Sequence, residues 1–282
     1  MLKIGHFNTL VVQDKTYNGL LLDGGSFGPV RILDAEGSAS EEVGDTVDVF
    51  VYPDSKGLLQ GTRQAPLACL GEVAWLEIAE VNDIGAFAHW GLPKDLFIPF
   101  AEQTSGLQAG KKVLVRVYLD NQSRLAGSMR LDHWVDDDAS RWNSGQQVAL
   151  IIGDRTELGY KAIIEHQCWG LLYSNELQQP LRKGMQLEGY IKRIRSDGRA
   201  DLSLEKPGYS KSRIDTVAEQ IMTTLGENDG YLMLNDKSSP AAIMSIFGVS
   251  KKVFKQALGA LYKQQRVQLD GRGIKLNETD AE

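Results

Sequence analysis

The feature that most constrains this chain is a sequence pattern that recurs at a fixed spacing. An apolar segment, a polar turn, a glycine and a second apolar segment occur around Gly19, again around Gly85, and again around Gly159. An offset of 66 residues separates Gly19 from Gly85, Gly44 from Gly110, and Asp54 from Asp120. The third copy follows at an offset of 74 to 77 residues, so it carries insertions. Repetition at this length predicts tandem copies of one small domain.

Apolar residues alternate with period two inside each repeat. Val113, Val115, Val117 and Leu119 do so in the second copy, as expected of a strand with one buried face. Turns rich in Gly, Asp, Asn and Ser divide each copy into about five short strands. Five strands in about 65 residues is the size of an OB-type barrel, whereas a propeller blade has four strands in fewer residues. The sequence therefore predicts a mainly β protein with three tandem five-stranded OB-type barrels.

After Pro207, the spacing of the apolar residues changes from the period of a strand to that of an amphipathic helix. Ser239-Pro240 and Ser250 predict the starts of two further helices, with Gly248 ending the first, and Gly226 is a plausible end for the preceding helix. Asp270-Gly271-Arg272 predicts a terminal hairpin turn. Three helices and a hairpin make an α+β winged-helix domain. The predicted domains are residues 1–66, 67–132 and 145–206 for the barrels and 211–278 for the winged helix.

Composition and charge restrict the setting and the partners. No apolar run is long enough for a membrane span, the N-terminus lacks a signal core, and the two cysteines are far apart, so we expect a reduced, cytoplasmic protein. The net charge is −6, but residues 1–138 have a balance of −9 and residues 139–282 a balance of +3. Phosphate attraction is therefore expected from the C-terminal half.

The repeats resemble S1 RNA-binding domains, which are OB-type barrels. The second copy carries the resemblance best, through Gly71-Glu72-Val73, Asn82 to Phe87, Lys94 to Pro99, and Asp120 to Arg124. Ile84 and Pro99 stand where that family has an aromatic residue and a histidine. Three such barrels followed by a winged helix resemble the bacterial conserved virulence factor B family. This resemblance implies an RNA-binding regulator of gene expression and no catalytic activity.

The resemblance and the local chemistry together nominate the site residues, because OB surfaces bind single-stranded RNA through exposed aromatic rings and basic side chains. The RNA-binding candidates are Phe87, Trp90, Asp120, Arg124, Tyr160, Tyr173, Lys192, Arg193, Arg195 and Arg199. The aromatic residues could instead fill barrel cores, and Arg199 could simply pair with Asp197. Lys192, Arg193 and Arg195 alternate along a strand, so only part of this set is expected to share one surface.

The winged helix has three candidate contact residues, Lys251, Lys252 and Lys255, on its predicted recognition helix. Residues 206–282 have a balance of only +2, so contact with protein competes with contact with DNA or RNA. We expect no metal and no cofactor, because the acids around His133 lie in a run that splays them apart. The leading hypothesis is post-transcriptional control through single-stranded RNA. The alternative is an adaptor that docks on the ribosome or the transcription machinery, and a nuclease is disfavoured because no span remains to house its domain.

Overall fold

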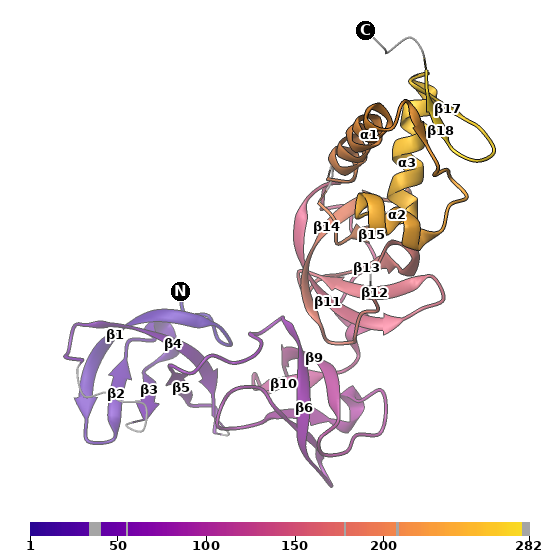
Figure 1. The fold of residues 1–282 in the computed structure, drawn as a ribbon. Coiled ribbons are helices and arrows are strands. Elements are labelled where there is room, and N and C mark those ends of the chain that lie inside the picture. Colours follow the sequence, from indigo (N-terminus) through magenta and orange to yellow (C-terminus); the bar gives the residue numbers. More distant parts are fainter. Residues whose placement is uncertain (34–40, 55, 178, 207–208, 278–282) are drawn as a thin grey trace. The chain divides into compact units, whose positions relative to one another are not determined.

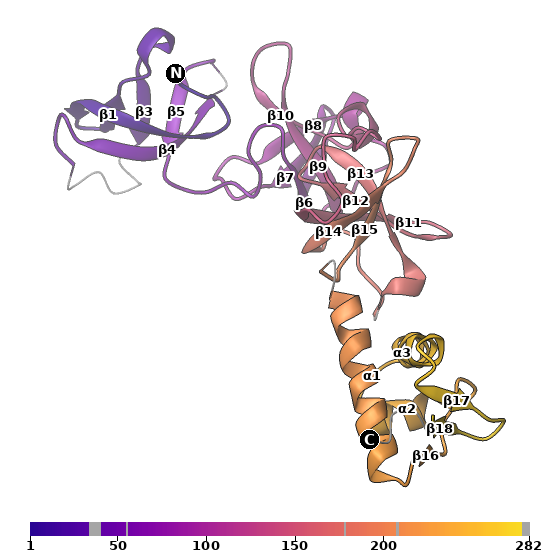
Figure 2. The same ribbon diagram turned by 90° about the horizontal axis from the view of Figure 1, so that it is seen from above.

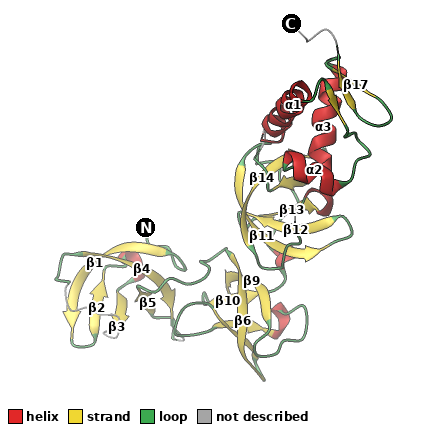
Figure 3. Cartoon of the chain, viewed as in Figure 1, coloured by secondary structure: helices red, strands yellow, loops and turns green. Residues whose placement is uncertain are grey.

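The chain forms two compact units, residues Met1–Ser203 and Leu204–Glu282. This computed structural model describes residues 1–33, 41–54, 56–177, 179–206 and 209–277. Strands dominate the first unit, and all three α-helices lie in the second (Figures 1 and 3). The prediction of a mainly β chain that ends in a winged helix is confirmed.

Barrel 1 is a closed five-stranded barrel with the strand order β1-β2-β3-β5-β4. Its strands are β1 (Phe7–Thr16), β2 (Gly19–Leu22), β3 (Val30–Leu33), β4 (Thr46–Pro53) and β5 (Leu59–Thr62). A single 3-10 turn, η1 (Gly25–Phe27), joins β2 to β3. The alternating residues Val47, Val49 and Val51 point into the core, as their period predicted.

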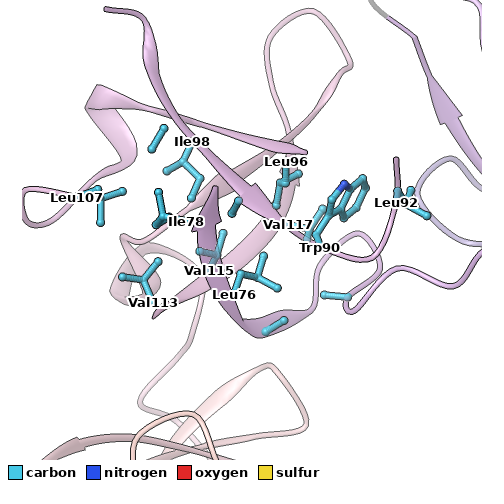
Figure 4. Close-up of a cluster of buried hydrophobic side chains, with 14 of the residues drawn as sticks. Leu76, Ile78, Trp90, Leu92, Leu96, Ile98, Leu107, Val113, Val115 and Val117 are labelled. Carbon is cyan, nitrogen blue, oxygen red and sulfur yellow. The ribbon is translucent and has the colours of Figure 1, made fainter. Parts of the chain in front are cut away.

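Barrel 2 has the sheet order β10-β9-β6-β7-β8, with β8 and β10 close enough to make the barrel nearly closed. Its strands are β6 (Val73–Asn82), β7 (Gly85–His89), β8 (Leu96–Pro99), β9 (Lys112–Leu119) and β10 (Leu125–Ser128). The 3-10 turn η3 (Phe100–Glu102) follows β8. Figure 4 shows the core of this barrel, in which Val113, Val115 and Val117 of β9 are buried.

Barrel 3 repeats the closed order of barrel 1, as β11-β12-β13-β15-β14. Its strands are β11 (Gln147–Arg155), β12 (Gly159–Ile164), β13 (Cys168–Tyr173), β14 (Gln186–Ile194) and β15 (Ala200–Ser203). The 3-10 turns η4 (Leu131–His133) and η5 (Ser174–Glu176) precede β11 and follow β13.

The repeated glycine at the start of the second strand has a steric cause. A Cβ on Gly85 would lie 2.6 Å from the carbonyl oxygen of Ile98, and a Cβ on Gly159 would lie 1.9 Å from that of Leu172. Both carbonyls belong to the third strand of their barrel, so only glycine permits this close pairing.

An apolar cluster joins barrel 2 to barrel 3. Val73 and Leu114 from barrel 2 and Ile151 and Ile163 from barrel 3 are buried together, with Leu131 and Val135 of the connecting segment among them. Leu114, Arg116 and Tyr118 are the outward residues of β9 between the core valines. The outward face of barrel 2 is thus used for packing as well as for solvent contact.

The second unit is a winged helix, seen in a second view in Figure 2. Its elements are α1 (Tyr209–Glu227), β16 (Tyr231–Leu232), α2 (Pro240–Phe247), α3 (Lys251–Lys263), β17 (Val267–Leu269) and β18 (Ile274–Leu276). The hydroxyls of Ser239 and Ser250 accept hydrogen bonds from the N–H groups of Ala242 and Val253, so both predicted caps are present. Gly248 ends α2 with a left-handed φ of 64°, whereas α1 continues one residue past Gly226.

Candidate nucleic-acid interface

A buried carboxylate organises the outer face of barrel 3. Asp201 on β15 is a charged residue, yet it is only 1% exposed. Its oxygens accept hydrogen bonds from Nε of Arg193 at 2.6 Å and from Nε of Arg195 at 2.8 Å. The hydroxyl of Tyr173 lies 3.3 Å from Oδ1 of Asp201 and accepts a hydrogen bond from Nη2 of Arg195 at 2.9 Å. We call these four residues the Asp201 cluster.

The Asp201 cluster keeps a surplus positive charge at the surface. Burial acts to raise the pKa of Asp201, but hydrogen bonds from Arg195 and Arg193 outweigh it and hold that pKa below its usual value. Asp201 is therefore ionised at neutral pH, yet two guanidinium groups share its single negative charge. Arg193 remains 65% exposed in its side chain. An exposed, oriented guanidinium beside a tyrosine ring suits both a phosphate oxygen and a base face.

A β-bulge brings the basic residues of β14 together. The pairing of β14 with β15 shifts between Ile191 and Arg193, so Lys192 is an extra residue in that strand. Nζ of Lys192 lies 6.0 Å from the centre of the Tyr173 ring and 2.5 Å from Oε1 of Glu176. The expectation that only part of this set shares one surface is therefore wrong, because strict alternation does not survive a bulge.

Next to the Asp201 cluster lies an open depression of about 470 Å³. Leu158, Lys161, Trp169 and Leu171 line it together with Arg195 and further residues. Nζ of Lys161 sits 4.1 Å from the centre of the Trp169 ring, and Nε1 of that indole is buried without a hydrogen-bond partner in the described structure. The depression thus combines a cation, an aromatic ring and apolar side chains on strands β12 and β13.

Two predicted stacking residues are core residues instead. Trp90 is 4% exposed and lies in the core of barrel 2 (Figure 4). Its Nε1 donates to the carbonyl of Lys94 at 2.7 Å, and its ring packs edge-on against Phe50 of barrel 1 at a centroid distance of 6.0 Å. Tyr160 is 7% exposed and points into barrel 3. Neither ring offers a face to a base, so the alternative that these aromatic residues fill the cores holds for both.

Phe87 is half-buried on β7, with its ring 5.3 Å from that of Phe97. This pair of rings forms part of the outer surface of barrel 2. No cation lies over either ring among the described contacts. Phe87 therefore stays a candidate, in a poorer setting than Tyr173.

Asp120 and Arg124 are paired with each other across the turn between β9 and β10. Oδ2 of Asp120 accepts from Nη2 of Arg124 at 2.7 Å, and Oδ1 accepts from the backbone N–H groups of Gln122 and Arg124. Burial opposes ionisation, but these hydrogen bonds lower the pKa of Asp120 overall. These hydrogen bonds show that Asp120 stabilises the turn, while the side chain of Arg124 stays partly exposed.

The turn between the last two strands shows which residues of the third repeat correspond to those of the second. The N–H of Asp120 bonds to the carbonyl of Arg124, and the N–H of Arg195 bonds in the same way to the carbonyl of Arg199. Arg195, not Asp197, therefore occupies the place of Asp120. Arg199 meets the side chain of Asp197 only through its backbone, since its N–H donates to Oδ1 of Asp197 at 3.2 Å. Its guanidinium pairs with another acid, because Nη2 lies 3.8 Å from Oδ2 of Asp137.

Asp201, Lys161, Trp169 and Leu171 were not predicted as site residues. The signal for Asp201 is an acid between two apolar residues of a strand, Ala200 and Leu202, which indicates a satisfied buried charge. The sequence around Lys161 does not indicate a site, because its partner Trp169 lies on the neighbouring strand β13.

On the winged helix, Lys252 and Lys255 of α3 are exposed and Lys251 is half-buried. Nζ of Lys255 lies 3.7 Å from Oδ2 of Asp236, within the same unit. The three lysines start at the N-terminal end of α3, where a recognition helix would meet its ligand.

Among the described residues, no group of three or more His, Cys, Asp or Glu side chains could hold a metal ion. The described helices include none long and apolar enough to cross a membrane.

Comparison with known protein families matches barrels 1 and 2 and the winged helix. The S1 domain family matches residues 4–64 and 70–130, and the CvfB-like winged helix domain matches residues 219–276. The chain is similar to the conserved virulence factor B proteins over nearly its whole length. The conserved virulence factor B of Staphylococcus aureus strain MSSA476 is 26% identical over 285 residues, which cover 95% of this chain and 91% of that protein.

Two further relatives extend over nearly the whole chain. "Uncharacterized protein YitL" of Bacillus subtilis is 26% identical over 269 residues, covering 92% of this chain and 89% of that protein. A crystal structure of a multidomain protein with nucleic acid binding domains from Streptococcus pneumoniae is 25% identical. That match covers 97% of this chain and 98% of the other, with a TM-score of 0.41. The matches to the two curated proteins therefore run over nearly the whole length of this chain and of each relative.

Proposed function

We propose that this chain holds single-stranded RNA on the outer face of barrel 3 and acts in post-transcriptional control of gene expression. The observation that carries the proposal is the Asp201 cluster, in which one buried carboxylate orients two guanidinium groups and a tyrosine. The adjoining depression with Lys161 over Trp169 extends this surface along β12 and β13. The S1 domain family matches barrels 1 and 2, and we extend its nucleic-acid-binding role, without catalysis, to barrel 3, which has the same closed strand order as barrel 1.

The charges on this face favour a single strand over a duplex. All five basic side chains near the face have an acidic partner of their own or share one, so few phosphates can be neutralised; they are Lys161, Lys192, Arg193, Arg195 and Arg199. Stacking of unpaired bases contributes about 1–3 kcal/mol each and depends little on salt. We therefore propose weak contacts per base, added up along tandem barrels. Phe87, together with Arg124, would provide a second, weaker contact on barrel 2.

The test is fluorescence anisotropy with a short unstructured RNA at low salt. Replacing Arg193 and Arg195 by alanine together should weaken binding at least tenfold, since it removes both charge-assisted donors. Arg31→Ala is the control, because it removes an exposed arginine from β3 of barrel 1, outside the proposed RNA contacts. Equal binding by the wild type and the double variant would overturn the site.

A second candidate function, a protein-interaction adaptor, is favoured by the surface of the winged helix. Met233, Met244, Ile246 and Tyr262 are exposed large apolar residues there. Docking on the ribosome or on a transcription complex through this unit is compatible with RNA binding by barrel 3. Co-purification with and without RNase distinguishes the two, because an adaptor keeps its protein partners after RNA is removed. In either role, the proposed setting is the cytoplasm, where the two free cysteines stay reduced.

A further inference from the structure

The junction between barrels 2 and 3 contains an open polar depression, called the junction cavity below, that the proposed RNA face does not use. Its volume is about 610 Å³, and its lining shares no residue with the depression on barrel 3. Arg116 and Glu72 come from barrel 2, His166 and Glu165 from the β12–β13 turn, and Trp134 from the connecting segment. The cavity therefore exists only because the two barrels pack together.

The junction around the cavity is held by specific contacts. The backbone N–H of Val73 donates to Nδ1 of His166 at 2.9 Å, and Nη1 of Arg116 donates to the carbonyl of His166 at 2.9 Å. Glu165 and His166 both have positive φ angles, 46° and 59°, which non-glycine residues adopt rarely. The β12–β13 turn is thus fixed in an uncommon conformation against barrel 2, so the walls of the cavity are preorganised.

An aromatic ring forms one wall of the cavity. Trp134 is 40% exposed, which is high for a tryptophan in a packed segment. Its ring contacts the guanidinium of Arg116 at 5.5 Å and the ring of Tyr118 at 5.4 Å. These two residues are neighbours on one side of β9, so they cover the indole from the strand side and leave part of it open.

The cavity offers hydrogen-bond donors that are not used up. Nε of Arg116 is buried and has no partner in the described part of the chain. Arg141 lies over the ring of Trp142 at 4.2 Å. Within the described residues, no ion pair joins either arginine to a carboxylate. Both arginines line the cavity without a carboxylate partner, so their terminal guanidinium nitrogens can donate to a ligand.

The cavity also contains hydrogen-bond acceptors, and these distinguish a nucleobase from a bare phosphate as its ligand. Glu72, Asp136 and Glu165 each accept a backbone hydrogen bond through one oxygen, from Cys69, Asp138 and Ala149 respectively. Three carboxylates outnumber two guanidinium groups, which disfavours a bare phosphate. Donors and acceptors beside an open aromatic ring match a nucleobase, whose edge carries both and whose faces stack.

We propose that this junction cavity receives one unstacked nucleobase of the bound RNA strand. The base stacks on Trp134, and its edge bonds to the guanidinium groups and the carboxylates around it. This inference rests on the proposed RNA binding by barrel 3 and adds a second contact that would read base identity, because paired donors and acceptors discriminate between base edges.

The test compares the wild-type full chain with Trp134→Ala, Trp134→Phe, Arg141→Gln and a matched exposed aromatic control, Tyr17→Ala, which lies in barrel 1 and is 96% exposed. Each is titrated with an unstructured RNA and with an abasic strand of the same length. Trp134→Ala should bind the RNA at least about fivefold more weakly, the lower limit for one stacked base. Trp134→Phe and Tyr17→Ala should bind like the wild type, and Arg141→Gln should also be weaker.

The abasic strand keeps the phosphates and removes the base, so it should bind Trp134→Ala and the wild type equally. If Trp134→Ala and Arg141→Gln both bind RNA as tightly as the wild type, the inference is wrong while the proposed function stands. If the wild type binds no RNA, both are wrong. Binding of free mononucleotides that depends on Trp134 while RNA binding does not would overturn the assignment to a base of the strand. A melting temperature of Trp134→Ala equal to that of the wild type shows that the junction is intact and the effect on binding is local. Arg141→Gln changes an exposed side chain, so its RNA affinity gives a second test of the cavity.

Discussion

Nη2 of Arg195 lies 2.5 Å from Oδ1 of Asp201, and that carboxylate is almost entirely buried while the arginine reaches the surface. In this pair the buried carboxylate fixes the orientation of the guanidinium, which can donate hydrogen bonds at the surface. Arg193 uses the other oxygen, so a single acid positions two cations beside Tyr173. The face of barrel 3 therefore depends on a residue that no ligand needs to touch.

Asp201→Asn should destabilise the chain, because both arginines lose a charged acceptor. The expected loss in the free energy of unfolding is about 1.5–3 kcal/mol at neutral pH, the range for a hydrogen bond to a charged group. Chemical denaturation of the full chain measures it. Asp197→Asn is the control, since Asp197 is exposed and an asparagine can still accept from the N–H of Arg199.

The same variant predicts a pH dependence. The pKa of Asp201 is lowered in the folded chain, so its contribution is complete above the pKa of the unfolded state and is lost as the pH falls through the folded value. The stability difference between the wild type and Asp201→Asn should stay constant above about pH 5 and shrink below it. A difference that grows with acidity would contradict the assigned pairing.

Gly184→Ala should weaken the junction of barrels 2 and 3. Gly184 has a φ of 83°, and a Cβ there would lie 2.2 Å from Cγ of Trp75 in barrel 2. Gly110, its counterpart in the second repeat, has a φ of 81° and no atom within 4 Å of such a Cβ. Gly110→Ala therefore costs only the backbone strain, about 1–2 kcal/mol, and Gly184→Ala should cost more. Equal melting temperatures for the two variants would argue against this contact.

Cys168 should be protected from thiol reagents in the folded chain. Burial raises the pKa of its thiol to about 11, although Arg141 acts in the opposite direction. Alkylation at neutral pH followed by mass spectrometry should label Cys69, which is half-buried, before Cys168. Unfolding with denaturant should make both react alike. Rapid native labelling of Cys168 would show that barrel 3 opens readily.

Ser250→Ala should destabilise the winged helix by about 1 kcal/mol, because the N–H of Val253 loses its side-chain acceptor. Hydrogen exchange of α3 in the full chain measures the effect locally. Ser245→Ala is the matched control on α2, where an exposed helical serine is replaced by a better helix former. Faster exchange in both variants would indicate that the cap is not the cause.

Much of the fold was predictable from the sequence. The offset of 66 residues, the alternation in Val113 to Leu119 and the caps at Ser239 and Ser250 depend on local rules, and the structure confirms the strands and helices that they indicate. The relation to conserved virulence factor B proteins is also confirmed.

The site was less predictable, because its residues meet only through tertiary packing. Trp90 looked like a surface ring, but its packing against Phe50 of another barrel could not be inferred from either repeat alone. The bulge at Lys192 is a local shift in pairing, and it overrides the alternation that would place Lys192 on the face opposite to Arg193 and Arg195. Asp201 could not be predicted as a site residue, because its three partners Tyr173, Arg193 and Arg195 come from other segments of the chain.

The central claim is that RNA lies on the outer face of barrel 3, and a hydrogen-exchange footprint of the full chain tests it most directly. The account predicts that an unstructured RNA slows exchange in β12, β13 and the β14–β15 turn, and that this protection disappears when Arg193 and Arg195 are both alanine. Protection confined to barrel 1 or to the winged helix, with barrel 3 unchanged, would contradict it.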